Sequence, residues 1–496
     1  MKDLKERSVR GGLARLCGQA AILVLRLGFM AIMARLLDPR DFGLVAMVSV
    51  VTGVYGLFST AGLSMATIQQ PNVTNEQISA LFWINILVGA ILCLLCLATA
   101  PALVSFYHEP RLFWVTVTMG IGFVLSAGGV QHSALLQRQM RYASLAVAET
   151  LSLLASFALG IVMALDGLEY WALVGSTIAA PAINTALVWG IAAWTPGVPR
   201  RGAGIYAMLR FGGTITLNNV VVYFAYNLDK LLLGRFWGAD ALGMYGRAYQ
   251  LINVPNSNLL SAVGTVMFSA LSRLHDDPIR LRNYFLKGYS LVSSITVPIS
   301  VFGATFADDI VLVVFGPKWA DAAAMFRLLT PTILVFGIIN PTGWLIQSVG
   351  LQGRSLRIAF AIAPLTIAAY LVGLPYGPNG VAFAFSASMM LWLVPHVFWA
   401  LHNTVISPWD ILVATCRPFF ASISAAAFAF GIQFYLINLG HLQSPFLKLS
   451  LASGVMIISY LVLFLFVMGQ KTFYFDLLRV LTGSTPPRGE TSTKAS

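Results

Sequence analysis

Charged residues are scarce in this chain, and their scarcity excludes an ordinary soluble protein. Asp, Glu, Lys and Arg make up 10% of its 496 residues, and hydrophobic residues make up 58%. A typical soluble domain has roughly 25% charged and about 45–50% apolar residues. Apolar runs of about 20 residues recur along the chain, and each is long enough to cross a bilayer as a helix. The alternating pattern of a membrane β-barrel is absent, so the sequence predicts an all-α integral membrane protein.

Sequence signatures of common enzymes are also missing. The chain has no phosphate-binding G-x-x-x-x-G-K-[ST] loop, no nucleophile elbow and no His, Cys and Glu set with metal-ligand spacing. Its four cysteines lie in or beside apolar segments, where they indicate packing and not redox chemistry. The polar gaps are too short to fold a catalytic domain. We therefore expect no enzyme, no cofactor and no metal, with a membrane glycan polymerase or ligase as the alternative from a different class.

The chain instead carries about fourteen apolar segments separated by short polar gaps. Lys and Arg gather in alternate gaps, which is the bias that marks cytoplasmic loops. This bias predicts that both termini are cytoplasmic, and it accounts for the net charge of +12 without nucleic-acid binding. The first segment has no clean cleavage site, so it predicts a retained helix and not a signal peptide. The predicted spans are 12–36, 44–66, 79–105, 113–135, 144–165, 171–194, 208–236, 243–272, 288–307, 323–350, 356–376, 380–402, 412–437 and 447–468.

Two features divide the chain into halves. The first is a stretch rich in Pro, Gly and Arg after the sixth predicted span, a composition typical of a linker. The second is an internal match, because ARLLDPRDFGLVA (34–46) aligns with GRFWGADALGMYG (234–246). Many transporters consist of two repeats with the substrate site between them, although many helical hairpins also end in Arg and restart with Gly. The predicted divisions are an N-terminal lobe at 1–194 (helices 1–6), a cytoplasmic linker at 195–210, a C-terminal lobe at 211–402 (helices 7–12), helices 13 and 14 within 403–468, and a cytoplasmic tail at 469–496.

Several charged residues lie inside the predicted spans. Asp229 and Lys230 are adjacent within one apolar segment, and Arg26 lies near the middle of the first. A charge at the centre of a bilayer costs about 2.5–3.5 kcal/mol on insertion scales, so such residues normally face protein or water. Polar residues are dense in the seventh and eighth spans, which predicts that these helices line a hydrated cavity. The alternative is that Asp229 and Lys230 neutralise each other near the surface and help the hairpin to insert.

Two stretches carry a resemblance to a known family. ARLLDPRDFG (34–43) fits the pattern R-x-L-x-P-x-x-[FY]-G, and NLDKLLLGRFWGADALGMYGRAYQL (227–251) fits a D-[KR]-[LV]-[IL]-[LI]-G run followed by L-G-x-Y. With about fourteen spans, the chain resembles the Wzx-type polysaccharide flippases of the MOP exporter superfamily, in the branch that exports exopolysaccharide and colanic-acid-like repeats. The resemblance implies two six-helix lobes plus two C-terminal helices. It also implies transport of an undecaprenyl-pyrophosphate-linked oligosaccharide across a bacterial inner membrane by alternating access.

This chemistry assigns expected roles to the polar residues of the spans. A pyrophosphate needs positive charge where water is scarce, so Arg26, Lys230 and Arg247 are expected to bind it. Asp229 and Glu149 are the candidates to carry a coupling proton or cation, although Glu149 also suits an interfacial ion pair with nearby arginines. The residues expected to hydrogen-bond sugar hydroxyls are Asn218, Asn219, Tyr226, Asn227, Gln250 and Asn253.

The expected partners are the lipid-linked oligosaccharide, membrane lipid, and polysaccharide polymerase and export proteins. A lipid II flippase of the same superfamily is the nearest alternative, because it shares the fold and the need for a cationic cavity. A multidrug exporter fits less well, since its organic-cation substrates disfavour a cavity that carries three positive charges.

Overall fold

The computed structural model describes residues 22–60, 67–68, 73–198, 206–274, 276–438, 444–471 and 474. All regular secondary structure in these residues is helical, which confirms the predicted all-α class. Ten of the described helices are long and apolar enough to cross a membrane. Together with the composition, these helices define a multi-pass membrane protein.

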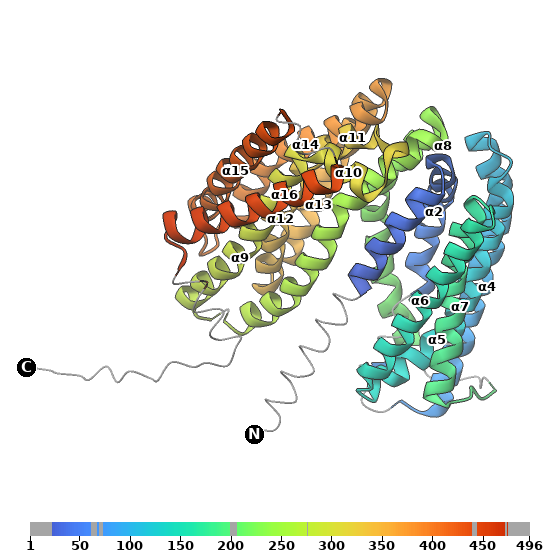
Figure 1. Ribbon diagram of the computed structural model, residues 1–496. Helices are drawn as coiled ribbons and strands as arrows, with labels where there is room; N and C mark the ends of the chain where they lie inside the picture. The colour runs from blue at the N-terminus through green and yellow to red at the C-terminus, as the bar shows by residue number, and fades with distance from the viewer. Residues whose placement is uncertain are drawn as a thin grey trace, which may run out of the picture. The chain divides into compact units, whose positions relative to one another are not determined.

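Five helices near the N-terminus pack side by side as a bundle (Figure 1). A helical segment at 22–36 precedes them. Within the bundle α4 packs against α5, α5 against α7, and α6 against α7, while α2 contacts α4, α5 and α7. The five are α2 (Pro39–Thr60), α4 (Asn75–Tyr107), α5 (Leu112–Arg138), α6 (Tyr142–Leu165) and α7 (Tyr170–Ala192).

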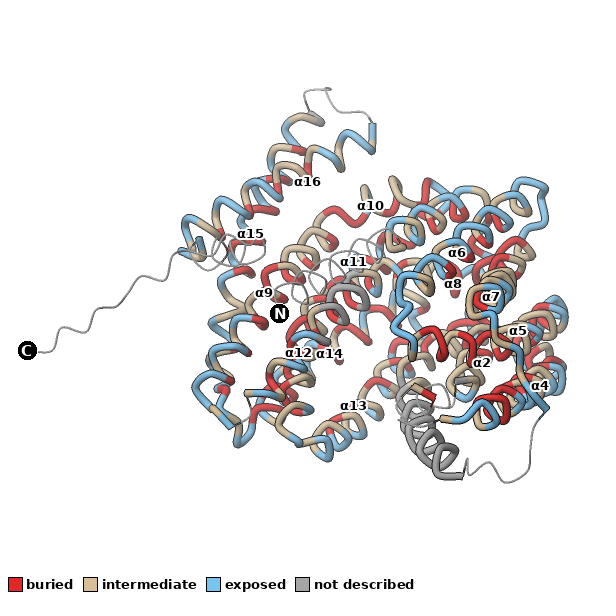
Figure 2. Tube along the Cα trace, turned by 90° about the horizontal axis from the view of Figure 1, so that it is seen from below, coloured by how far each residue is buried: buried red, intermediate tan, exposed pale blue. Residues whose placement is uncertain are grey.

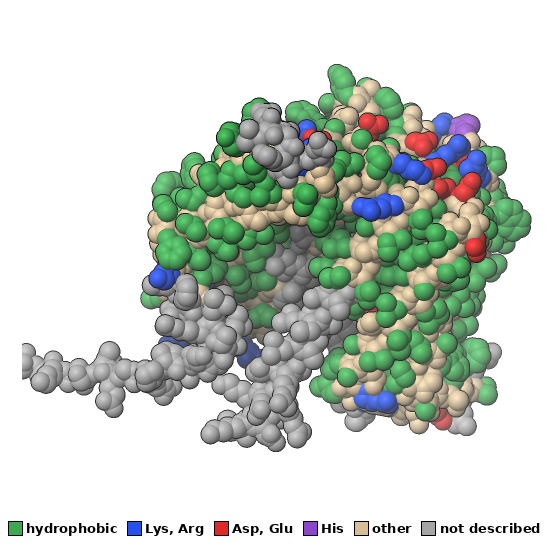
Figure 3. Space-filling view, in the orientation of Figure 1, with side chains coloured by type: hydrophobic (Ala, Val, Ile, Leu, Met, Phe, Trp, Pro, Cys, Tyr) green, Lys and Arg blue, Asp and Glu red, His purple; other side chains and the backbone are tan. Residues whose placement is uncertain are grey.

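Local signals in the sequence begin and end these helices. Thr74 caps α4 through a reciprocal pair of hydrogen bonds. The backbone amide of Gln77 donates to the Thr74 hydroxyl, and the backbone amide of Thr74 donates to the side-chain oxygen of Gln77. At the other end of α4, His108 adopts a left-handed conformation with φ 57°. Charged side chains gather there over the tops of the helices, whereas the flanks below are largely apolar (Figure 3). This distribution suits helices whose sides face lipid and whose ends face water.

Helix α8 (Tyr206–Arg273) runs for 68 residues, where the sequence predicts two spans at 208–236 and 243–272. A single residue separates its two arms, since Gly238 has φ 83° and ψ −176° while its neighbours stay helical. Glycine adopts such a positive φ without steric cost. The predicted polar loop at 237–242 is therefore reduced to a sharp bend at Gly238.

The remaining helices follow the predicted spans apart from one break and one short extra helix at Ala307–Val314. Thr330 and Pro331 divide the predicted helix 323–350 into two, because proline cannot donate the backbone hydrogen bond that would continue the first. These helices are α9 (Pro278–Thr305), α10 (Ala307–Val314), α11 (Ala322–Leu329), α12 (Pro331–Ser348), α13 (Gln352–Gly373), α14 (Gly377–Leu401), α15 (Pro408–Asn438) and α16 (Pro445–Val462), with 3-10 turns at Pro317–Trp319 and Leu374–Tyr376 and a π-helical turn at Leu463–Val467.

The chain forms two compact units. The first comprises Met1–Val254, Val311–Leu329 and Gly353–Val394, and the second comprises Pro255–Ile310, Thr330–Gln352 and Pro395–Ser496. The predicted lobe boundaries stay a prediction. In the second unit α15 packs against both α9 and α16, around a cluster of small and aromatic side chains. Exposed stretches alternate with buried ones along α15 and α16, as expected for helices with one face toward lipid (Figure 2).

Candidate functional site

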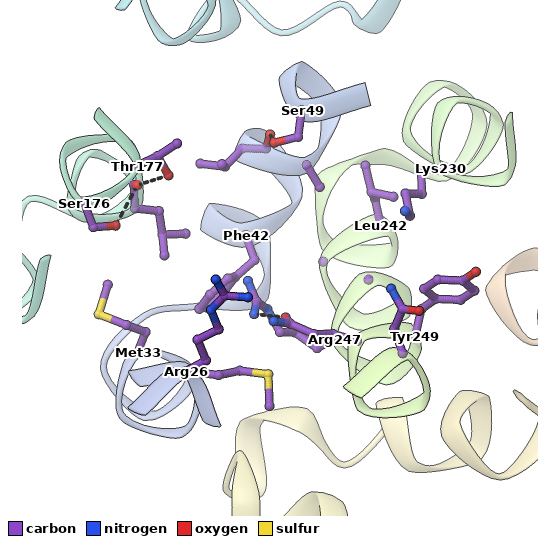
Figure 4. A pocket seen from close by; sticks show the side chains of 18 of the residues that line it. Arg26, Met33, Phe42, Ser49, Ser176, Thr177, Lys230, Leu242, Arg247 and Tyr249 are labelled. Atoms are coloured by element: carbon purple, nitrogen blue, oxygen red, sulfur yellow. Dashed lines mark hydrogen bonds between the residues drawn. The ribbon is translucent and has the colours of Figure 1, made fainter. Parts of the chain in front are cut away.

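The first unit contains a cavity of about 600 Å³. The helical segment 22–36, α2, α6, α7 and both arms of α8 contribute to its wall (Figure 4). Its size falls within the range of ordinary ligand pockets, which is about 300–1,000 Å³. The polar side chains that line it are Arg26, Ser49, Ser176, Thr177, Tyr223, Asn227, Lys230, Arg247, Tyr249, Gln250 and Asn253.

Three of these side chains are cationic, and they share one depth along their helices. Arg26 lies ten residues before the end of its helix at Leu36, and Lys230 and Arg247 lie eight and nine residues from the bend at Gly238. At about 1.5 Å per residue, these spacings place all three roughly 12–15 Å from the helix ends. This depth is about half of the 30 Å hydrocarbon core of a bilayer.

The two arginines lie together at one side of the cavity. The Arg247 guanidinium stacks over the Phe42 ring, 4.0 Å from the ring centre, and donates a hydrogen bond to the Gln250 side chain. Figure 4 shows the Arg26 side chain also directed toward Phe42. Within the described residues Arg26 makes no hydrogen bond or ion pair, so its donors are available to a ligand. Both guanidinium groups can bind phosphate oxygens in a bidentate manner.

Neighbours on α8 position the third cation. The Lys230 ammonium donates to the Asn227 amide oxygen at 2.8 Å and lies 5.1 Å from the centre of the Tyr249 ring. Asn227 is oriented in turn, because its amide nitrogen donates to the Tyr223 carbonyl at 2.9 Å. Neither contact neutralises the charge. These contacts therefore orient the Lys230 ammonium group.

The described lining of the cavity contains no carboxylate. Asp229 follows Asn227 on the same helix, but its side chain is fully buried outside the cavity. It accepts a hydrogen bond from the Tyr245 hydroxyl at 2.8 Å and another from the Lys230 amide at 2.8 Å. Because Gly238 lies between Asp229 and Tyr245, this bond joins the two arms of α8. Three cations thus face the cavity without a carboxylate among the lining residues.

The two matching motifs of the sequence meet beside this cavity. Gly43 packs so closely on the Ala239 carbonyl that a β-carbon would overlap it. Gly243 packs in the same way on the Pro39 carbonyl. The two glycines occupy the same position in the aligned motifs, and each contacts the residue four positions before the other glycine. The contact is therefore reciprocal. A symmetric contact of this kind resembles the self-complementary interface of a two-fold dimer.

Three predicted site residues, Asp229 among them, do not line the cavity, and two lie outside the described side chains. Tyr226 is half-buried on α8 and does not line the cavity. Glu149 is exposed on α6 and does not line it either. The structure describes the helix that contains Asn218 and Asn219 but not their side chains. Arg26, Asn227, Lys230, Arg247, Gln250 and Asn253 line one cavity.

Sequence reasoning missed part of the wall. Ser49, Ser176 and Thr177 are small hydroxyl residues of the kind that commonly bond their own helix, as the Ser176 and Thr177 hydroxyls do to the Leu173 carbonyl. Such residues give no distinctive signal in an apolar span. Phe29 and Phe157 stack with ring centres 4.0 Å apart and form an apolar side, and aromatic residues in a span equally indicate simple packing.

The fold and the cavity define a class of protein: a multi-pass membrane protein with a cavity lined by three cationic side chains. Residues 32–324 match the family described as polysaccharide biosynthesis protein, which is more than half of the 496 residues. The chain belongs to this family.

Known proteins support this assignment. The chain is 27% identical over 379 residues to the lipopolysaccharide biosynthesis protein WzxC of Escherichia coli (strain K12), covering 75% of this chain and 76% of that protein. It is 24% identical over 447 residues to the succinoglycan biosynthesis transport protein ExoT of Rhizobium meliloti (strain 1021), covering 88% of each. The solved structure of the lipid II flippase MurJ in its inward closed conformation has the same fold, with a TM-score of 0.72 and 14% identity over 94% of this chain and 100% of that one. The predicted resemblance to Wzx-type proteins is confirmed at the level of this family and of the fold.

Proposed function

We propose that this protein moves undecaprenyl-pyrophosphate-linked oligosaccharide repeat units across the bacterial inner membrane, for exopolysaccharide or lipopolysaccharide synthesis. The observation that carries this proposal is the set of three cations at mid-membrane depth, with no carboxylate among the lining residues that the structure describes. A pyrophosphate is a compact anion, and an unpaired anion is expensive in a medium of low dielectric constant. Arg26, Lys230 and Arg247 would replace its lost hydration with charge-assisted hydrogen bonds.

The rest of the cavity suits the other parts of such a substrate. Amides and hydroxyls, among them Asn227, Gln250 and Asn253, line the wall beside the cations and would hydrogen-bond sugar hydroxyls. Phe29 and Phe157 form an apolar part of the wall, which would contact the first part of the polyprenyl chain. Alternating access to the two sides of the membrane would then carry the head group across, with both chain termini in the cytoplasm.

The similar proteins favour transport over polymerisation, because one relative is named a transport protein and the structural neighbour is named a flippase. The energy would come from an ion gradient or from consumption of the product on the outer side. Asp229 and Glu149 are the candidates for a coupling proton or cation. Asp229 is fully buried and makes no hydrogen bond to the side chains of the cavity cations, whereas Glu149 is exposed on α6.

Flipping in proteoliposomes tests the proposal. A labelled undecaprenyl-pyrophosphate oligosaccharide is reconstituted with the protein, and the fraction exposed to a membrane-impermeant glycosidase is followed over time. We expect protein-dependent exposure, and we expect Lys230→Ala to slow it about tenfold or more, because one charge-assisted bond to the phosphate is lost. Arg357→Ala is the matched control, since Arg357 is an exposed cation that does not line the cavity.

Three outcomes would count against the proposal. Folded wild-type protein that exposes no substrate under an imposed proton or sodium gradient would contradict flipping. Faster exposure of lipid II than of the oligosaccharide lipid would reassign the substrate to peptidoglycan precursors. Elongated glycan in place of exposed repeat units would identify a polymerase. Survival of full activity in Lys230→Ala would remove Lys230 from the site and leave the transport function standing.

A further inference from the structure

The second compact unit contains a pocket of its own, which shares no lining residue with the cationic cavity. It measures about 350 Å³ and lies between α9, α15 and the chain segment that includes the π-helical turn after α16. Leu286, Val413 and Phe464 contribute apolar surface to its wall. The polar side chains that line it are Ser290, Asp410, Arg417 and Gln470. The pocket is therefore amphipathic.

Hydrogen bonds connect the helices that form this pocket. The Tyr289 hydroxyl pairs with the Thr415 hydroxyl at 2.8 Å and so joins α9 to α15. The Tyr460 hydroxyl donates to the Ser294 carbonyl at 2.8 Å and joins α16 to α9. Within a bilayer such bonds resist separation of helices, because no water competes for them. The pocket is thus a fixed feature of the second unit and not a gap between loose helices.

One positive charge in the pocket has no counter-charge among the residues that the structure describes. Arg282 neutralises Asp410 through two hydrogen bonds, at 2.6 Å and 3.3 Å, and the Ser407 amide donates to the same carboxylate at 3.0 Å. Arg417 has no hydrogen bond, ion pair or aromatic partner among the residues that the structure describes. Its guanidinium therefore provides five unused donors in an otherwise neutral pocket.

The Arg417 side chain can extend from within the membrane toward the phosphate level of a bilayer leaflet. It lies nine residues after the start of α15 at Pro408, which is about 14 Å along the helix. An arginine at such a depth extends its side chain toward the membrane surface. Trp409, 68% exposed, lies near the helix start, where tryptophan is typical of the membrane–water interface.

The same end of the second unit is rich in basic residues. The sequence predicts that it faces the cytoplasm, where anionic lipids attract basic segments. Basic pockets between transmembrane helices on that side commonly bind lipid head groups. The described basic residues at this end are Arg273, Arg280, Arg282, Lys287, Arg417 and Lys471, and the described acidic ones are Asp276, Asp277 and Asp410.

We propose that this pocket binds the head group of an anionic phospholipid from the surrounding leaflet, with the phosphodiester on Arg417 and the first part of the acyl chains along Phe464 and Val413. A phosphodiester carries one negative charge, and the pocket has one uncompensated positive charge. The three cations of the transport cavity instead match a pyrophosphate. The charge balance therefore assigns the pocket to a bilayer lipid and not to the transported one.

Native mass spectrometry of the full chain tests the site. The delipidated protein is titrated with phosphatidylglycerol, and the apparent Kd of the first bound lipid is measured. We expect Arg417→Gln to raise this Kd about ten- to hundredfold, as the loss of a charged hydrogen-bond partner does, and Arg417→Lys to retain most of the affinity. Ala414→Phe keeps the charge but fills the pocket, so it should weaken binding as well.

Lys287→Gln is the matched control, because Lys287 is an exposed cation next to Leu286 in the sequence but does not line the pocket. An unchanged first Kd in both Arg417→Gln and Ala414→Phe would overturn the proposal. Equal weakening by Lys287→Gln would do so too, since it would indicate general surface attraction. Displacement of phosphatidylglycerol by a lower concentration of undecaprenyl pyrophosphate would assign the pocket to the substrate lipid instead.

Discussion

The fully buried carboxylate of Asp229 accepts a hydrogen bond from the Tyr245 hydroxyl at 2.8 Å. An acidic residue in an apolar span indicates a polar environment, and the sequence places it next to Lys230. Its partner is Tyr245, sixteen residues further on, and the two meet only because the chain reverses at Gly238. No periodicity of a straight helix brings these two residues together. A contact made across a one-residue bend cannot be read from spacing alone.

Removal of the Tyr245 hydroxyl should destabilise the protein. In Tyr245→Phe the fully buried Asp229 carboxylate loses a hydrogen-bond donor at 2.8 Å. Such a loss costs about 1–3 kcal/mol, because the group keeps its desolvation penalty. The apparent melting temperature in detergent should fall. Tyr249→Phe is the control, since the hydroxyl of Tyr249 has no hydrogen bond within the described residues while its ring lies near Lys230.

The replacement Asp229→Asn refines this test. Asparagine has nearly the same shape and its amide oxygen accepts from Tyr245, so it removes the charge and keeps the bond. We expect Asp229→Asn to melt at or above the wild-type temperature. A fall as large as that of Tyr245→Phe would mean that the charge itself stabilises the fold. Equal effects of Tyr245→Phe and Tyr249→Phe would show that the hydrogen bond contributes nothing.

At the scale of elements, the apolar runs predict the helices well because each must satisfy its own backbone hydrogen bonds in lipid. The bend in α8 and the break before Pro331 depend on single residues. The polar loop expected at 237–242 is absent because one glycine with positive φ is sufficient to reverse the chain. The packing of one motif on the other is not visible in the alignment of 34–46 with 234–246. An alignment shows that the two segments are similar, but only the folded structure shows that they are in contact.

The reciprocal glycine contact makes a prediction about paired substitutions. A β-carbon at Gly43 would overlap the Ala239 carbonyl, and one at Gly243 would overlap the Pro39 carbonyl. We expect Gly43→Ala and Gly243→Ala each to lower stability by about 1–3 kcal/mol, the usual cost of overpacking. Gly56→Ala, also on α2, has open space for the new methyl and should be neutral or slightly stabilising.

The double variant distinguishes one shared contact from two separate ones. Once Gly43→Ala has pushed the two segments apart, the second methyl at Gly243 meets less resistance. The combined loss in unfolding free energy should therefore be smaller than the sum of the single losses. Strict additivity would indicate two independent sites. A Gly56→Ala loss equal to that of Gly43→Ala would show that any added methyl in α2 is harmful.

At the scale of the whole molecule, the sequence predicts orientation from charge, and the prediction can be tested with the full chain. Lys and Arg are concentrated in alternate gaps between the predicted spans, so the predicted gap 273–287 should lie in the cytoplasm and the predicted gap 308–322 outside. In a variant without native cysteines, single cysteines replace exposed residues in each gap, as Arg280→Cys and Asp321→Cys. Neither residue lines the transport cavity or the lipid pocket.

A membrane-impermeant thiol reagent applied to whole cells should label Asp321→Cys and should label Arg280→Cys only after the membrane is permeabilised. The physical reason is that translocating a cluster of cations against the membrane potential costs about 2.3 kcal/mol per charge per 100 mV. The gap around Arg280 also carries Arg273, Arg282 and Lys287, whereas the gap around Asp321 carries one lysine, Lys318. The reverse labelling pattern would invert every helix. It would then place the Arg417 pocket in the outer leaflet and reverse the direction in which the cationic cavity must take up its substrate.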